Sequence, residues 1–85
     1  MVPYKIFFKS SVEKDLRGIP RADLKKILSK IAQLADNPRP HGCEKLVGHD
    51  RYRIRQGNYR VVYSIKDDEL VVWVFRVAHR KDVYR

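Results

Sequence analysis

Two different spacings of apolar residues divide the chain. In residues 21–35 apolar side chains recur every three or four positions, which predicts an amphipathic helix of about four turns ending at Asn37 and Pro38. From residue 51 onward the period is two, so residues 51–56 and 59–65 are predicted to form strands. The change of period separates a helical first part from a β-rich second part.

The N-terminal segment is predicted to add a strand and a shorter helix. Residues 3–8 have the aromatic and β-branched content of a short strand. Ser10 or Ser11 can cap a helix that ends at residues 18–20, where a glycine and a proline occur. The two helices are therefore expected to form a hairpin.

The rest of the chain completes an α+β fold. Residues 38–48 contain too many prolines and glycines for a helix or strand, whereas the continuously apolar residues 70–77 predict a central strand covered on both faces. We expect a single domain over residues 1–85, in the order β-α-α-β-β-β. Its antiparallel sheet of about four strands would carry the N-terminal two-helix hairpin on one face.

The charge of the chain indicates a polyanionic partner. Its 85 residues include 19 Lys and Arg but only 10 Asp and Glu, a formal net charge of +9. Hydrophobic residues make up 44% of the sequence, enough for a folded core and unlike a disordered basic tail. Nucleic acid is the most economical partner for such a domain, with an acidic protein or an anionic membrane as alternatives.

No motif for a metal, a cofactor or secretion is present. Cys43 is the only cysteine, and the three histidines have no zinc-site spacing. The three consecutive acids at 67–69 lack the spacing of a calcium loop and are typical of a solvated turn. Without a signal-like or membrane-spanning apolar run, the protein is expected in the cytoplasm, with no membrane association.

The segment from residue 51 to residue 63 carries the strongest candidate site. It holds four arginines, three tyrosines and no acid, and forked cations beside aromatic rings suit phosphates and unpaired bases. Arg53, Arg55 and Arg60 are expected on the sheet face opposite the helices. The alternative is a solvated strand face whose tyrosines belong to the core.

Residues 52–85 resemble the C-terminal half of RelE-type toxins of the RelE/ParE toxin-antitoxin superfamily. The shared pattern is YRIR.G.YRV.Y followed by V.HR..VY, and a KL.G motif occurs at residues 45–48. The resemblance implies a RelE-like fold and an endoribonuclease that cuts mRNA in the ribosomal A site. It also implies attack by the RNA's own 2′-hydroxyl, with no metal and no cofactor.

The resemblance further implies a set of catalytic residues. Its members are the cations and the terminal tyrosine of the motif: Arg53, Arg55, Arg60, Arg80 and Tyr84. Arg60 and Arg80 would hold the phosphate, with Arg80 also near the leaving group. Tyr84 would stack on or orient a base and share in proton transfer.

The sequence departs from the best-known pattern of the family, which has lysine at one or both of the positions of Arg53 and Arg55. Arginine is a poor general base because it is effectively always charged. His79, next to Arg80, is therefore the natural substitute, although it could equally pack at the end of its strand. His41 and His49 are expected to face solvent or to stabilise a turn.

The same resemblance implies a role for the remaining basic residues and the identity of the partners. Ribosomal RNA is the expected ligand of five further cations: Arg21, Lys25, Lys26, Lys30 and Arg51. A RelB-like antitoxin from an adjacent gene is the implied protein partner, with promoter DNA contacted only through it. Two alternatives remain: a ParE-type inhibitor of DNA gyrase without nuclease activity, and a basic RNA-binding module without catalysis.

Overall fold

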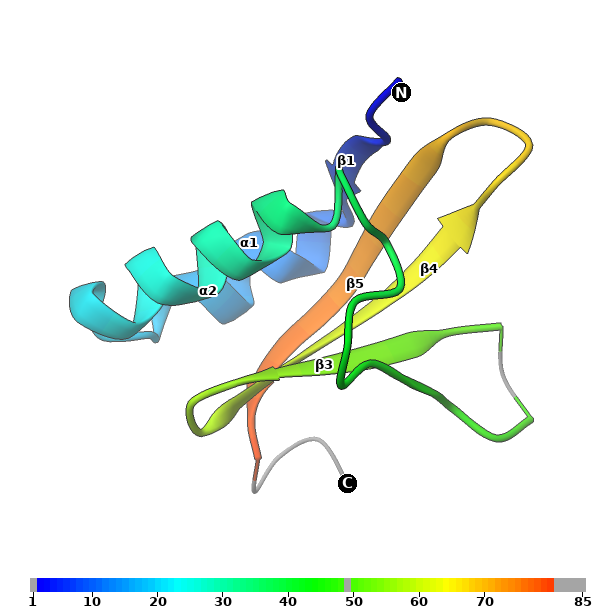
Figure 1. Cartoon of the computed structure of the whole chain (residues 1–85). Helices are drawn as coiled ribbons and strands as arrows, with labels where there is room; N and C mark the ends of the chain where they lie inside the picture. Colours follow the sequence, from blue (N-terminus) through cyan, green and yellow to red (C-terminus); the bar gives the residue numbers. More distant parts are fainter. Residues whose placement is uncertain (1, 49, 81–85) are drawn as a thin grey trace.

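The computed structural model describes residues 2–48 and 50–80, which form two helices and five strands. The elements are β1 (Lys5–Phe8), α1 (Ser10–Arg17), α2 (Arg21–Gln33), β2 (Glu44–Lys45), β3 (Tyr52–Gln56), β4 (Tyr59–Lys66) and β5 (Val71–His79). Both helices lie on the same side of one twisted sheet (Figure 1). The predicted α+β class, the helical hairpin and the order of the main elements are confirmed.

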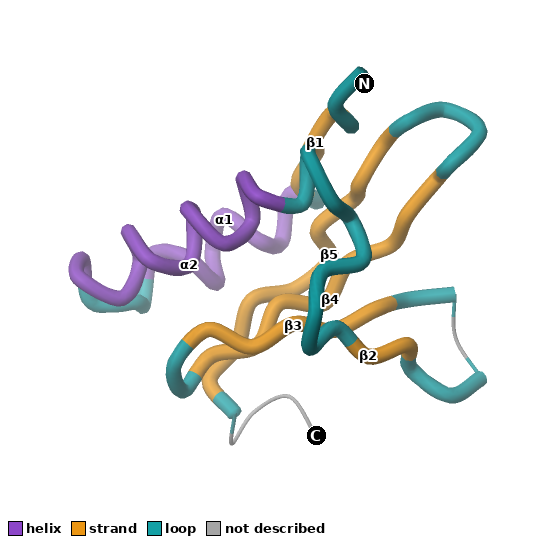
Figure 2. The backbone as a smooth tube through the Cα atoms, viewed as in Figure 1, coloured by secondary structure: helices purple, strands orange, loops and turns teal. Residues whose placement is uncertain are grey.

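The sheet is mixed and has one strand more than expected. Its strand order is β1-β5-β4-β3-β2, and β1 runs parallel to β5 while the other neighbours are antiparallel. A parallel pair needs a long crossover, and the chain between β1 and β5 includes both helices. The extra strand, β2, is a two-residue pairing of Glu44 and Lys45 with β3 inside the loop where no element was predicted (Figure 2).

The core lies between the helices and one face of the sheet. The helices and the loop between them contribute Val12, Ile19, Ile27 and Ile31, and Leu34 follows α2 directly. The sheet contributes Ile54, Val61, Tyr63, Ile65, Val72, Val74 and Val77. These side chains alternate along β4, as the apolar pattern of the sequence predicts, whereas in β5 the interval between them changes after Val74.

The middle of the sheet is β4, which corrects the expectation that residues 70–77 form the strand covered on both faces. All residues from Arg60 to Ile65 are buried. In β5 only Val72, Val74 and Val77 are fully buried, and they face the helices. The residues between them lie on the opposite side of the strand and are only half-buried or exposed.

A β-bulge interrupts the alternation of β5. Val62 is paired with Arg76 and Tyr63 with Val74, so Phe75 is an additional residue in β5. The inward positions therefore change from Val74 to Val77, an interval of three instead of two. One extra residue thus reverses the faces of all later positions in the strand.

The start of α1 also differs from the prediction. Lys9 occupies the N-cap position, and neither it nor a neighbouring serine makes a side-chain cap hydrogen bond. The helix is instead held to β5, since the Asp15 carboxylate accepts a hydrogen bond from the backbone N–H of Val77 at 3.1 Å. This contact lies next to the bulge and fixes α1 on the sheet.

A polar cluster joins the loop after α2 to the β4–β5 turn. Arg39 donates two hydrogen bonds to the Asp67 carboxylate, at 3.1 and 2.8 Å, and one to the Tyr52 hydroxyl at 3.3 Å. Tyr4 donates to Asp67 at 2.7 Å. The hydrogen bonds from Arg39 and Tyr4 lower the pKa of Asp67 to about 2. The ionised carboxylate therefore connects three segments that are distant in sequence.

Candidate nucleic-acid interface

The sheet face opposite the helices, which we call the open face, gathers the arginines of β3 and β4. Arg55 lies directly opposite Arg60 on the neighbouring strand, and Arg53 lies opposite Val62. Directly paired residues in an antiparallel sheet project to the same side. Since Ile54 and Val61 point into the core, the three arginines project together from the open face.

The three arginines differ in exposure, but all of them influence the same carboxylate, that of Glu44. Arg60 is buried, Arg55 is exposed, and the Arg53 side chain is 12% exposed. Arg53 donates a hydrogen bond of 2.7 Å to the Glu44 carboxylate. That hydrogen bond and the Arg53 charge lower the pKa of Glu44, and the charges of Arg55 and Arg60 lower it further. A carboxylate is thus stabilised by all three cations, as a phosphate would be.

Arg80 lies at the same end of the sheet. It follows β5 directly, and its backbone N–H donates to the carbonyl oxygen of Asn58 at 2.7 Å. Asn58 belongs to the two-residue turn between β3 and β4, and Arg55 and Arg60 are each the second residue away from that turn. Tyr84, the last predicted catalytic residue, lies outside the described residues.

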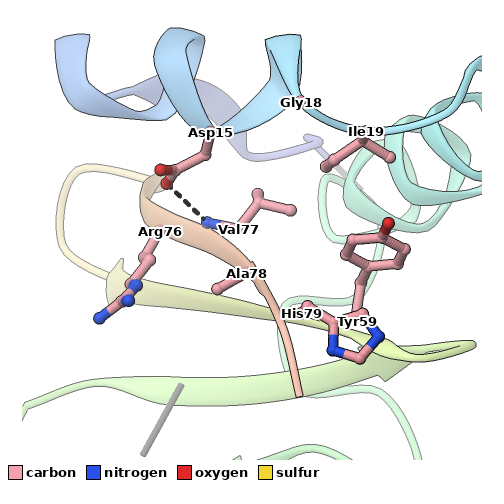
Figure 3. A pocket seen from close by; sticks show the side chains of 8 residues that line it. All are labelled: Asp15, Gly18, Ile19, Tyr59, Arg76, Val77, Ala78 and His79. Atoms are coloured by element: carbon pink, nitrogen blue, oxygen red, sulfur yellow. Dashed lines mark hydrogen bonds between the residues drawn. The ribbon is translucent and has the colours of Figure 1, made fainter. Parts of the chain in front are cut away.

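His79 is on the other face of the sheet. It is paired with Tyr59, and the two rings meet edge to face with their centroids 5.5 Å apart. Both rings line a pocket beside Gly18 and Ile19 of the loop between the helices (Figure 3). The structure therefore does not bring His79 together with the arginines of the open face. The bulge in β5 is the physical reason, because it reverses the side on which His79 projects.

The opposite end of the open face carries aromatic rings that the sequence interpretation missed. Phe7 and Trp73 stack with centroids 5.1 Å apart and an angle of 30° between their planes. Lys9 lies over Trp73 at 4.5 Å, and the Arg51 guanidinium lies over Phe75 at 3.9 Å. The signal is present in the sequence, since valine and an aromatic residue alternate from Val72 to Phe75. Because this run is continuously apolar, its pattern predicts a doubly covered strand and does not distinguish the two faces.

The predicted RNA-binding cations of the helical part form a separate surface. Arg21, Lys25 and Lys26 are exposed on α2, and Lys30 is half-buried. The three lysines line a shallow pocket with Gln56 from the end of β3. This surface lies on the helical side of the molecule, whereas Arg51 belongs to the open face.

Neither a cluster of metal-ligating side chains nor a membrane-spanning helix is found among the described residues. Within residues 2–48 and 50–80, no group of three His, Cys, Asp or Glu side chains is close enough to hold a metal ion. No helix in the same ranges is long and apolar enough to cross a membrane. His41 is exposed, as expected, and His49 lies outside the described residues.

Solved structures that superpose on this helical hairpin and mixed sheet come from complexes of a toxin with its antitoxin. The archaeal RelE–RelB complex from Pyrococcus horikoshii contains a chain that superposes with a TM-score of 0.84 at 29% identity. The match covers 95% of this chain and 99% of that chain.

Sequence comparison agrees with the structural match. Residues 6–84 match the family model described as ParE toxin of type II toxin-antitoxin system, parDE. Toxin RelG of Mycobacterium tuberculosis is 31% identical in an alignment of 88 positions that covers 99% of each chain. Putative toxin RelE1 of Methanocaldococcus jannaschii is 30% identical over 86 residues, 96% of each. The chain belongs to the RelE/ParE superfamily of type II toxin-antitoxin toxins.

Proposed function

We propose that the protein is a ribosome-dependent mRNA endoribonuclease that cuts mRNA in the A site and so inhibits translation. The observation that supports this most is the direct opposition of Arg55 and Arg60 on adjacent strands. Like charges in this position destabilise a sheet. A phosphate bound between them would turn that repulsion into attraction, so the pair is better suited to binding an anion than to stabilising the fold.

The proposed reaction needs only the RNA and positive charge. The 2′-oxygen of one ribose attacks the adjacent phosphorus, and the bond from phosphorus to the 5′-oxygen of the next nucleotide breaks. The 2′-hydroxyl loses its proton and the departing 5′-oxygen gains one, which leaves a 2′,3′-cyclic phosphate and a 5′-hydroxyl. Arg55, Arg60 and Arg80 would stabilise the additional negative charge on the phosphorane. Arg53, held by Glu44, would support them from the next position of β3.

Proton transfer receives less support from this chain's own groups. Arginines remain charged at all relevant pH values, and His79 projects from the wrong face to accept a proton at the open face. We therefore leave His79 out of the proposed phosphate site. Ribosomal positioning of the 2′-oxygen in line with the scissile bond would supply much of the rate instead. The role of Tyr84 in stacking and proton transfer stays a prediction.

The cations of α2 would hold the toxin on ribosomal RNA. Arg21, Lys25 and Lys26 are exposed and lie away from the open face, so both surfaces can be occupied at once. Contacts of this kind are made to phosphates and weaken steeply with salt. Docking and cleavage should therefore respond to separate substitutions.

The proposed protein partner is a RelB-like antitoxin, encoded by an adjacent gene. The similar chain from Pyrococcus horikoshii was solved as a RelE–RelB complex. A basic toxin surface suits an acidic segment of such a partner. Any contact with promoter DNA would then be made through the antitoxin.

Inhibition of DNA gyrase is the second candidate function, because the matching family model carries the name of the ParE toxin. In a reconstituted translation reaction, the nuclease proposal predicts transcripts cut at A-site codons. Arg55→Gln, Arg80→Ala and Tyr84→Phe should each reduce cleavage strongly. Intact transcripts together with gyrase-linked DNA breaks would refute the nuclease proposal and support the alternative.

A further inference from the structure

The aromatic end of the open face is the feature that the proposed phosphate site leaves unexplained. It consists of Phe7, Trp73 and Phe75, with Lys9 and Arg51 lying over the rings. We propose that this aromatic cluster is a second RNA subsite, which stacks a nucleobase of the single strand whose phosphate lies at the arginine end. The inference rests on the proposed function, since it takes the same RNA as the ligand.

The exposure of the cluster leaves its rings accessible to a ligand. Phe7 is 42% exposed, and Trp73 and Phe75 are half-buried on a face that no helix covers. A stacked pair of rings at a surface presents a flat apolar platform, which binds unpaired bases regardless of their identity. Folding alone leaves this apolar ring surface exposed to water. A base stacked on the platform would bury it.

The charges around the cluster favour a nucleic acid over an apolar segment of a protein. Lys9 reaches both Trp73, at 4.5 Å, and Phe75, at 5.2 Å, from the ring centroids. Among the ion pairs within residues 2–48 and 50–80, none includes Lys9 or Arg51. Their cationic groups are thus available to the phosphates of a nucleotide whose base stacks nearby.

The cluster also lies at a useful distance from the phosphate site. Arg60 is paired with Ala78, and Trp73 lies five residues earlier in the same strand. At about 3.3 Å per residue these positions are at most roughly 16 Å apart along β5. An extended strand of a few nucleotides spans that length. One bound RNA could therefore contact the arginines with its scissile phosphate and the rings with a base further along.

Trp73 allows a direct test because it is the only tryptophan in the chain. The probe is a short single-stranded oligoribonucleotide with 2′-O-methyl groups, which cannot be cut by 2′-oxygen attack. We expect saturable quenching of Trp73 fluorescence by this RNA at low salt, and none by inorganic polyphosphate, which carries charge but no bases. Equal quenching by polyphosphate, or none by the RNA, would overturn the proposal.

Phe7 and Phe8 provide a matched pair of variants. Both are 42% exposed and lie in β1, but Phe8 lines a groove against the helices with Leu16 and Leu28. We expect Phe7→Ala to weaken RNA binding by about five- to a hundredfold, the range for loss of one stacked base, and Phe8→Ala to leave it unchanged. The binding is measured by anisotropy of labelled 2′-O-methyl RNA. Equal losses in the two variants would refute a stacking subsite.

The salt dependence separates stacking from charge. Phe7→Ala should lower affinity without altering the slope of log affinity against log salt, because it removes no phosphate contact. Lys9→Gln should reduce the slope by about 0.7. Loss of antitoxin binding in Phe7→Ala with RNA binding intact would overturn the inference in favour of a protein ligand. Since none of these measurements uses cleavage, a failure of the nuclease proposal is detected independently in the translation assay.

Discussion

Arg55→Gln should make the toxin more stable and less active. The substitution removes one of two like charges that oppose each other on β3 and β4. Opposed side chains have Cβ atoms about 5 Å apart. Two unit charges about 6 Å apart repel by about 0.7 kcal/mol in water and about 3 kcal/mol at an effective dielectric constant of about 20. Because Arg55 is exposed while Arg60 is buried, we expect a gain near the lower value.

The gain can be measured with the intrinsic fluorescence of Trp73. A free energy of unfolding larger by about 0.7 kcal/mol corresponds to a rise in melting temperature of about 3 to 6 °C for a domain of this size. Cleavage in the reconstituted translation reaction should fall about a hundredfold, as for loss of one preorganised group that stabilises developing negative charge. The two effects therefore have opposite signs.

The matched control is Arg17→Gln. Arg17 is also an exposed arginine, but it lies on α1 and forms an i,i+4 ion pair of 2.9 Å with Glu13, where both side chains are 74% exposed. Its loss should lower stability slightly, by at most about 0.5 kcal/mol, and leave cleavage near the parental rate. A destabilised Arg55→Gln, a stability gain that persists undiminished in 1 M salt, or cleavage unchanged in that variant would refute the reasoning.

Three further predictions concern single side chains. Glu44→Gln removes the carboxylate that Arg53 holds, so the affinity for 2′-O-methyl RNA should rise several-fold; unchanged or weaker binding in anisotropy would contradict this. Asp67→Asn should destabilise the fold at pH 7. The folded-state pKa of Asp67 is depressed from 3.8 to about 2, so its contribution is present above about pH 4 and is lost as the pH falls through 2. Urea unfolding should therefore show a difference between the variant and the parent that closes in acid. His79→Gln should cleave at the parental rate from pH 6 to 8, because His79 projects away from the open face; a lost pH dependence would restore it as the base.

The main elements were predictable because the alternation of side chains is local. The helical spacing before residue 36 and the twofold spacing after residue 51 each depend on neighbours in sequence, and the arginines of β3 and β4 were placed on the correct face from that spacing alone. The two-residue β2 was not predictable, since its only support is pairing with β3. Parallel pairing of β1 with β5 was missed for the same reason.

The candidate site was predictable where it depends on one strand and not where it depends on register. The shared face of three arginines follows from the alternation within their own strands: Arg53, Arg55 and Arg60. The face on which His79 projects depends on the bulge. The bulge is visible only when Val62 and Tyr63 are matched to their partners in β5. The aromatic cluster required knowledge of which sheet face the helices leave uncovered.

The additional residue in β5 also limits how functional residues can be transferred between relatives. Residues before Phe75 and residues after it follow opposite alternations, so an aligned column beyond this position has a defined face only if both proteins contain the bulge. In a relative whose β5 has the same number of residues but no bulge, the residue aligned with His79 would project beside the arginines, and the residue aligned with Val77 would leave the core. Deleting Phe75 from this chain would instead remove the bulge and leave Val77 opposite Val61 and His79 opposite Tyr59, on their present face. An identical histidine in two members of the superfamily is therefore evidence of a shared role only when the bulge in this strand is also conserved.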